Sequence, residues 1–113
     1  MKARFLPAAT LELEIAADTY ADIGPDLGRA FRQEVQWIVT LIAENRRIGH
    51  LVESGTDTSL REFILRRFPY RLIYSIEARN ILIVAVAHQH RRWGYWSDRV
   101  EEPAAAYDIP LAA

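Results

Sequence analysis

The chain has 113 residues, of which 50% are hydrophobic and 26% are charged, and its formal net charge at pH 7 is −1. This composition predicts one ordinary globular domain and excludes a disordered chain, and the absence of cysteine excludes disulfides, thiol catalysis and cysteine-based zinc sites. The longest apolar run, residues 81–87, is far shorter than the roughly 20 residues that span a bilayer. With no export signal visible, we expect a cytoplasmic protein with no membrane partner.

Charge is distributed unevenly along the chain. Residues 1–59 carry six basic and nine acidic side chains, residues 60–99 carry eight and three, and residues 100–113 carry three acids and no base. This is either chance clustering on a solvated surface or a basic working face followed by an acidic tail, which would suit a polyanionic or acidic partner. We expect a single domain over residues 1–100 and an acidic C-terminal tail over residues 101–113.

A short strand and two helices are predicted first. The strand covers residues 3–6, and Pro7 after it suits the first turn of a helix, where its missing N–H costs nothing. Apolar residues at spacings of three and four predict an amphipathic helix of about 16 residues, which Gly24 and Pro25 end. A second apolar stripe predicts a helix that ends near Asn45. The tight break between the two predicts an antiparallel helical hairpin.

Trp37 and His50 lie outside these patterns. Trp37 is beside the main apolar stripe of the second helix, so it belongs either to the margin of the core or to a partner surface, and we favour the core. His50 lies in residues 46–59, which have two glycines and no sustained period and therefore predict a loop. A lone loop histidine is more often solvated than functional.

Three strand patterns follow, over residues 60–68, 70–77 and 81–87. Pro69 separates the first two, and a tight turn over residues 78–80 separates the last two. The last pattern is apolar on both faces, which is typical of a central strand covered on both sides. The predicted fold class is α+β in the order β-α-α-β-β-β, with the helical hairpin packed on one face of a mainly antiparallel four-stranded sheet.

The order of elements, the hairpin RRFPYRLIYSI (66–76) and the ending AVAHQHRRWGYW (85–96) resemble the RelE/ParE superfamily of toxins from bacterial type II toxin–antitoxin systems. The similarity covers residues 1–99 and is nearest to the ParE-like, plasmid-stabilisation branch. It implies a cognate antitoxin whose C-terminal segment wraps and neutralises the toxin, and assembly as a homodimer or as a heterotetramer with that antitoxin. The candidate antitoxin-binding residues are Phe31, Trp37 and Leu41.

The resemblance leaves the target open, because RelE-like members cut messenger RNA in the ribosomal A site whereas ParE-like members poison DNA gyrase. For a ribonuclease, the resemblance suggests Arg71, His90, Arg91 and Tyr95 as the catalytic set. Arg71 would stabilise charge at the scissile phosphate, although a structural role in ordering the sheet is the interpretation we favour. The tyrosine register is ambiguous, because Trp96 falls at the aligned position and tryptophan cannot exchange a proton.

A second group of basic and aromatic residues suits contact with a target or a nucleic acid. Interleaved arginine and aromatic side chains fit phosphates and bases, and they fit a protein interface equally well. The group consists of Arg61, Arg66, Arg67, His88, Arg92, Trp93 and Trp96. The alternatives are that His88 ends the core strand and that Tyr95 and Trp96 pack the C-terminal segment onto the sheet, and we favour both. No trustworthy metal-ligand spacing is present, so we expect no cofactor.

The sequence therefore favours the ParE-like toxin of a type II toxin–antitoxin pair that inhibits growth by poisoning DNA gyrase, and favours a binding protein over an enzyme. The first rival is a metal-independent, ribosome-dependent messenger RNA endoribonuclease. The second rival is an attenuated toxin that serves only as an antitoxin-binding co-repressor.

Overall fold

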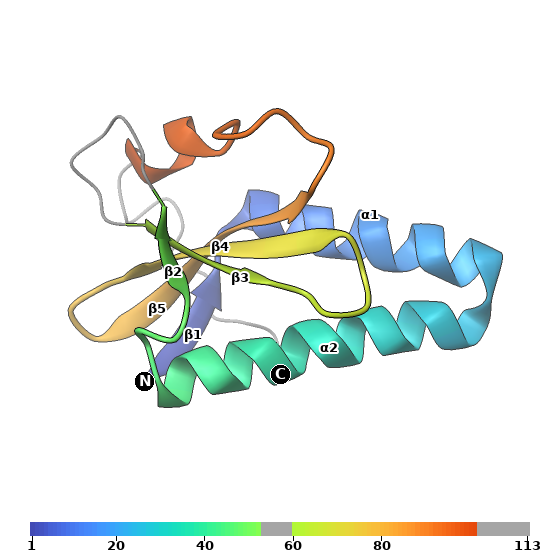
Figure 1. The fold of residues 1–113 in the computed structure, drawn as a ribbon, viewed down its shortest axis with the longest axis horizontal. Helices are drawn as coiled ribbons and strands as arrows, with labels where there is room; N and C mark the ends of the chain where they lie inside the picture. Colours follow the sequence, from blue (N-terminus) through green and yellow to red (C-terminus); the bar gives the residue numbers. More distant parts are fainter. Residues whose placement is uncertain (53–59, 102–113) are drawn as a thin grey trace.

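The computed structural model describes residues 1–52 and 60–101 of the chain. In the described residues the chain forms two helices, five strands and a short 3-10 helix (Figure 1). The elements are β1 (Lys2–Phe5), α1 (Pro7–Ile23), α2 (Pro25–Glu44), β2 (His50–Val52), β3 (Leu60–Ile64), β4 (Tyr70–Ile76), β5 (Asn80–His88) and η1 (Ser97–Glu101). Residues 53–59 of the predicted loop and residues 102–113 of the predicted tail lie outside the described residues.

The strands form one mixed sheet in the order β1-β5-β4-β3-β2. β1 runs parallel to β5, and the other neighbours are antiparallel. The predicted α+β class and the order of the main elements are confirmed, and β5 lies inside the sheet as its apolar pattern predicts. The sheet has five strands instead of four. The additional strand, β2, lies inside the predicted loop and pairs with the first three residues of β3.

The predicted strand over residues 60–68 is too long. β3 ends at Ile64, and the backbone N–H of Leu65 donates to the carbonyl of Tyr70 at 2.9 Å, which closes the turn into β4. The chain must reverse here so that Ile64 can pair with Arg71. Residues 66–69 are therefore turn and not ladder, and they lie against α2.

The two helices form the predicted antiparallel hairpin, and the end of the hairpin extends beyond the sheet (Figure 1). Pro7 and Pro25 each occupy the first turn of a helix, where the ring fits without breaking a hydrogen bond. Gly28 of α2 permits the two helices to approach closely, because a Cβ at this position would lie 2.9 Å from the carbonyl oxygen of Ala17 in α1. The two helices therefore pack closely as one layer on the sheet.

The core side of α2 consists of Phe31, Val35, Ile38, Val39 and Ile42, all of which are buried. The prediction that Trp37 belongs to the core is wrong, since its side chain is 47% exposed. Its position on the helix turns it away from the stripe that packs on the sheet. No helix in the described part of the chain is long and apolar enough to cross a membrane.

Candidate functional site

After β5 the chain turns back over the sheet and ends in η1 (Figure 1, orange to red). The backbone N–H of Gln89 donates to the carbonyl of Pro69 at 2.8 Å, and Gly94 takes a positive φ of 81° that permits the return. We call residues 89–99 the C-terminal segment. It carries most of the side chains that the sequence nominates for a target or for catalysis.

One acidic side chain of α1 holds the C-terminal segment in place. The hydroxyl of Tyr95 donates to Glu12 Oε2, and the guanidinium of Arg99 donates to both carboxylate oxygens, at 2.8 and 3.1 Å. Glu12 Oε1 also accepts the backbone N–H of Val86 at 3.0 Å, and Arg99 donates to the carbonyl of Val84 at 3.0 Å. We call Glu12, Tyr95 and Arg99 the C-terminal clamp, because together they join α1, β5 and the C-terminal segment.

The environment of Tyr95 keeps its hydroxyl protonated. Burial, followed by the hydrogen bond to the Glu12 carboxylate, raises the pKa of Tyr95 far above its ordinary value. Two guanidinium groups lie near the ring, with the central carbon of Arg91 4.1 Å and that of Arg99 5.1 Å from its centroid. In this arrangement Tyr95 is a hydrogen-bond donor with a structural partner, and it cannot accept a proton near neutral pH.

Arg71 and Arg61 are also engaged within the fold. Arg71 forms an ion pair with Glu62 on the neighbouring strand at 3.0 Å, and the two side chains are 20% and 19% exposed. Arg61 donates to the carbonyls of Arg47 and Gly49 at 3.2 and 2.7 Å, which ties the loop after α2 to β3. The ion pair of Arg71 supports the structural role that we favoured from the sequence.

The histidines lie at the end of β5. His88 is half-buried and is the last residue of the strand, with its ring 4.9 Å from that of Tyr70 and 5.1 Å from that of His90. The backbone N–H of His90 donates to His88 Nδ1 at 3.0 Å. In the described residues no cluster of three histidine or acidic side chains could hold a metal ion.

Two of the nominated contact residues are buried. Trp96 is 2% exposed and packs edge-on against Trp93 and Tyr95, so the prediction that it stacks on a target is wrong and the packing alternative is right. Phe31 is 0% exposed among the rings of Phe68 and other aromatics, so it cannot contact an antitoxin directly. Of the nominated residues in the C-terminal segment, His90, Arg91, Arg92 and Trp93 are exposed.

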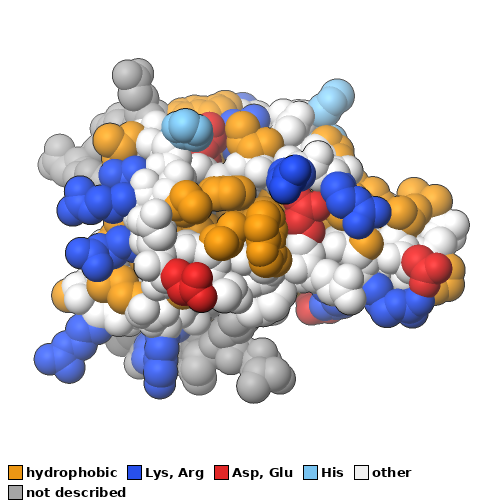
Figure 2. All heavy atoms as spheres, turned by 60° about the horizontal axis from the view of Figure 1, so that its bottom comes forward, with side chains coloured by type: hydrophobic (Ala, Val, Ile, Leu, Met, Phe, Trp, Pro, Cys, Tyr) orange, Lys and Arg blue, Asp and Glu red, His pale blue; other side chains and the backbone are white. Residues whose placement is uncertain are grey.

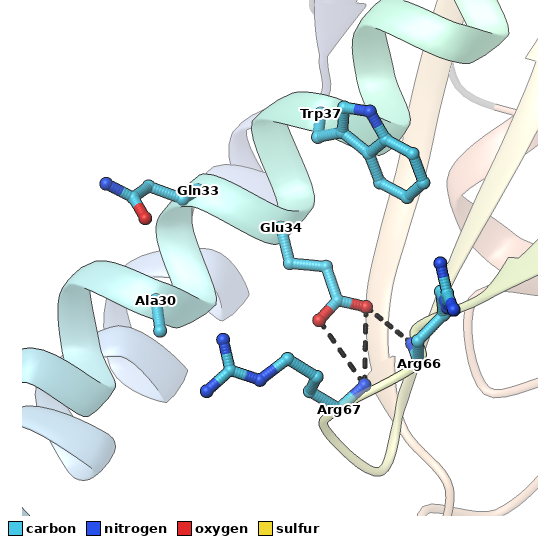
Figure 3. Close-up of a pocket in the computed structure, with 6 residues that line it drawn as sticks. All are labelled: Ala30, Gln33, Glu34, Trp37, Arg66 and Arg67. Carbon is cyan, nitrogen blue, oxygen red and sulfur yellow. Dashed lines mark hydrogen bonds between the residues drawn. The ribbon is translucent and has the colours of Figure 1, made fainter.

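A second candidate site is a groove of about 510 Å³ between α2 and the β3–β4 turn. We call it the α2 groove, and it is lined by Ala30, Gln33, Glu34, Trp37, Arg66 and Arg67 (Figure 3). Glu34 points from α2 to the turn and accepts the backbone N–H groups of Arg66 and Arg67. Leu41, one helical turn beyond Trp37, is half-buried. The groove thus brings together Trp37 and two arginines that the sequence assigned to separate groups.

Sequence reasoning missed the carboxylates that organise both sites, Glu12 and Glu34. A signal exists for Glu12, which is three residues after Ala9 and four before Ala16 and therefore lies on the buried side of its helix. An acidic residue on such a face predicts a buried partner. Its side-chain partners, Tyr95 and Arg99, are however more than 80 residues away in the sequence.

The sequence matches the family model described as the ParE toxin of the type II toxin–antitoxin system parDE over residues 3–93. The chain belongs to the ParE toxin family. The resemblance to the ParE branch is thereby confirmed. The matched region ends at Trp93, so Tyr95 and Arg99 of the C-terminal clamp lie beyond the part that this ParE family model covers.

A solved structure described as the chromosomal ParDE toxin–antitoxin system from P. aeruginosa has the same fold as this ParE-family chain. The TM-score is 0.66 at 20% sequence identity, and the match covers 78% of this chain and 95% of that chain. At this identity the likeness concerns the fold alone. Comparison with curated proteins finds no match.

Proposed function

We propose that this toxin inhibits bacterial growth by binding and poisoning DNA gyrase, without cleaving RNA, and that a cognate antitoxin neutralises it. Membership of the ParE family supports the class of target and the existence of the antitoxin. A gyrase target would place the protein in the cytoplasm. The observation that carries the proposal is the engagement of the nominated catalytic side chains inside the fold.

Metal-independent cleavage of RNA needs a proton acceptor, a group that stabilises charge at the phosphate and a proton donor for the leaving oxygen. Tyr95 has its proton held by Glu12 and its pKa raised, and Arg71 is paired with Glu62. Of the four nominated residues only His90 and Arg91 are exposed. An exposed imidazole and one guanidinium are an incomplete set, which supports binding over cleavage.

The exposed part of the C-terminal segment is the surface that we assign to the target. Trp93 is 51% exposed, and the adjacent Arg92 and the nearby His90 are exposed as well. Tryptophan and arginine are the residue types that contribute most to protein interfaces. The C-terminal clamp ties this segment to α1 and β5, which favours a surface that is organised before a target binds.

The test is inhibition of gyrase supercoiling and accumulation of cleaved DNA complexes with the purified chain. We expect both effects at micromolar concentration, and we expect Trp93→Ala with Arg92→Ala to reduce them while the variant remains folded. Arg79→Ala, in the distant turn between β4 and β5, is the matched control. Normal gyrase activity together with codon-positioned cuts in messenger RNA, abolished by Arg71→Ala, would instead establish the ribonuclease.

A further inference from the structure

We propose that the α2 groove binds an acidic segment of the antitoxin, with carboxylates on the guanidinium groups of Arg66 and Arg67 and an apolar side chain on Trp37. This inference rests on the proposed function, because it names the part of the toxin that the antitoxin occupies and the chemistry of the occupant. It also reassigns Arg66 and Arg67 from the target to the antitoxin.

The first support is that neither guanidinium group has an acidic partner among the residues that the structure describes. Glu34 is the acidic residue that lines the groove, and its carboxylate accepts the backbone N–H groups of Arg66 and Arg67, the latter at 3.3 and 3.4 Å. Neither guanidinium forms an ion pair with any residue that the structure describes, and Arg67 merely packs 5.7 Å from the ring centroid of Phe68. Glu34 therefore fixes the turn while its two arginine side chains stay available.

The second support is the placement of these side chains. In Figure 3 the side chain of Arg66 rises toward the ring of Trp37, and that of Arg67 runs beneath α2 toward Ala30. Figure 2 shows apolar side chains gathered in the middle of the face that α2 presents, with basic side chains beside them. Trp37 is 47% exposed, so its ring offers an apolar surface next to two positive charges.

The third support is the match between these groups and a peptide. A guanidinium binds a carboxylate through two parallel hydrogen bonds, and an exposed tryptophan is a preferred anchor for apolar side chains. Ala30 and Trp37 are seven residues apart on α2, so the groove extends along about 10 Å of the helix. This length accommodates a short stretch of chain that carries both carboxylates and an apolar residue.

A nucleic acid fits the groove less well. The carboxylate of Glu34 lies between the two arginines, where a run of phosphates would have to pass (Figure 3). An acidic peptide can place separate carboxylates on the two arginines and keep uncharged backbone near Glu34.

The central experiment is calorimetric titration of the full-length toxin with the purified product of the neighbouring antitoxin reading frame. Reversing both charges, with Arg66→Glu and Arg67→Glu, is expected to weaken binding on the order of tenfold to hundredfold and to reduce its dependence on salt. Arg79→Glu makes the same kind of change at an exposed position outside the groove and is expected to leave affinity unaltered. Circular dichroism verifies that each variant is folded.

Gln33 provides a second test that leaves the turn intact. Its side chain is exposed and lines the groove, so Gln33→Glu adds a competing carboxylate and is expected to weaken binding several-fold, whereas Gln33→Lys is expected to maintain or strengthen it. Trp37→Ala is expected to weaken binding without changing the salt dependence. Equal effects of the two Gln33 substitutions would contradict the charge preference.

The outcomes separate this inference from the proposed function. An antitoxin that binds the wild type and the charge-reversed variant equally well overturns the groove assignment and leaves neutralisation in place. Failure of the antitoxin to bind the wild type overturns neutralisation itself, and the groove assignment with it. Binding of a fluorescent 20-nucleotide DNA or RNA strand that the same variants abolish, with antitoxin binding unchanged, assigns the groove to nucleic acid.

Discussion

The C-terminal clamp and the α2 groove each combine a glutamate with arginine side chains, but the charged groups are paired differently in the two places. In the clamp, the carboxylate of Glu12 is met by the side chains of Tyr95 and Arg99, and every charged group is satisfied internally. In the groove, the carboxylate of Glu34 is met by backbone N–H groups, so the guanidinium groups of Arg66 and Arg67 face outward. The first arrangement closes a surface, and the second leaves one open.

The difference shows that the partner of each carboxylate decides what its arginines can do. Arg99 and Glu12 are 20% and 15% exposed, and Arg71 and Glu62 are exposed to a similar extent, so these arginines stabilise the fold. Arg66 and Arg67 are exposed and lie beside an exposed tryptophan. A basic stretch of sequence therefore contains arginines that are paired within the fold and arginines that we propose for recognition.

The largest expected effect is on the clamp. Glu12→Ala removes the carboxylate that accepts from the Arg99 guanidinium, the Tyr95 hydroxyl and the Val86 backbone N–H, and we expect the free energy of unfolding to fall by about 3 kcal/mol. Urea denaturation measures this loss. Glu14→Ala is the control, because its ion pair with Arg32 is exposed and contributes less than about 1 kcal/mol. Equal losses in both variants would show that the clamp is no more than a surface contact.

Substitution of Arg71 tests whether its ion pair with Glu62 in the sheet contributes to stability as the clamp does. Arg71→Ala leaves the half-buried carboxylate of Glu62 unpaired, so we expect a loss of about 1–2 kcal/mol in unfolding free energy. A double-mutant cycle with Glu62→Ala should give a coupling energy of about 1 kcal/mol. Purely additive losses would show that Arg71 does not stabilise the fold through Glu62, and would make it a candidate for phosphate contact again.

Tyr95→Phe removes one donor to Glu12 and keeps the ring, so we expect a loss of about 1 kcal/mol at neutral pH. The folded protein holds the Tyr95 proton more tightly than the unfolded chain does, because burial raises the pKa of this hydroxyl. Its contribution is therefore complete below the unfolded pKa of about 10 and is lost as the pH rises above it. Urea titrations from pH 8 to 11 should show the difference between wild type and Tyr95→Phe shrinking with pH, and a constant difference would contradict this cause.

The smallest expected effect on stability belongs to the groove. Arg66→Ala and Arg67→Ala remove exposed guanidinium groups but keep the backbone N–H groups that Glu34 binds, so each should change the unfolding free energy by less than about 0.5 kcal/mol. Glu34→Ala, which releases the turn, should cost more than either. Thermal unfolding of the three variants makes the comparison. A large loss of stability in either arginine variant would show that this arginine stabilises the fold, as Arg99 does in the clamp.

Local patterns predicted the helical hairpin and the three long strands, because apolar periodicity and the proline and glycine breaks decide them within a few residues. β2 was missed because three residues carry no measurable period. Trp37 was misplaced because its exposure depends on how α2 is rotated against the sheet. The role of Glu12 depends on a segment that returns from the opposite end of the chain, which no local pattern reveals.

β5 continues past the end of β1, whose pairing stops at Ile83. A strand margin left uncovered in this way is a template on which another chain can add a strand, and it is a common origin of aggregation. Here the N–H of Val86 and the carbonyl of Val84 are already taken by Glu12 and Arg99. The contacts that hold the C-terminal segment thus also occupy two backbone groups that an added strand would need.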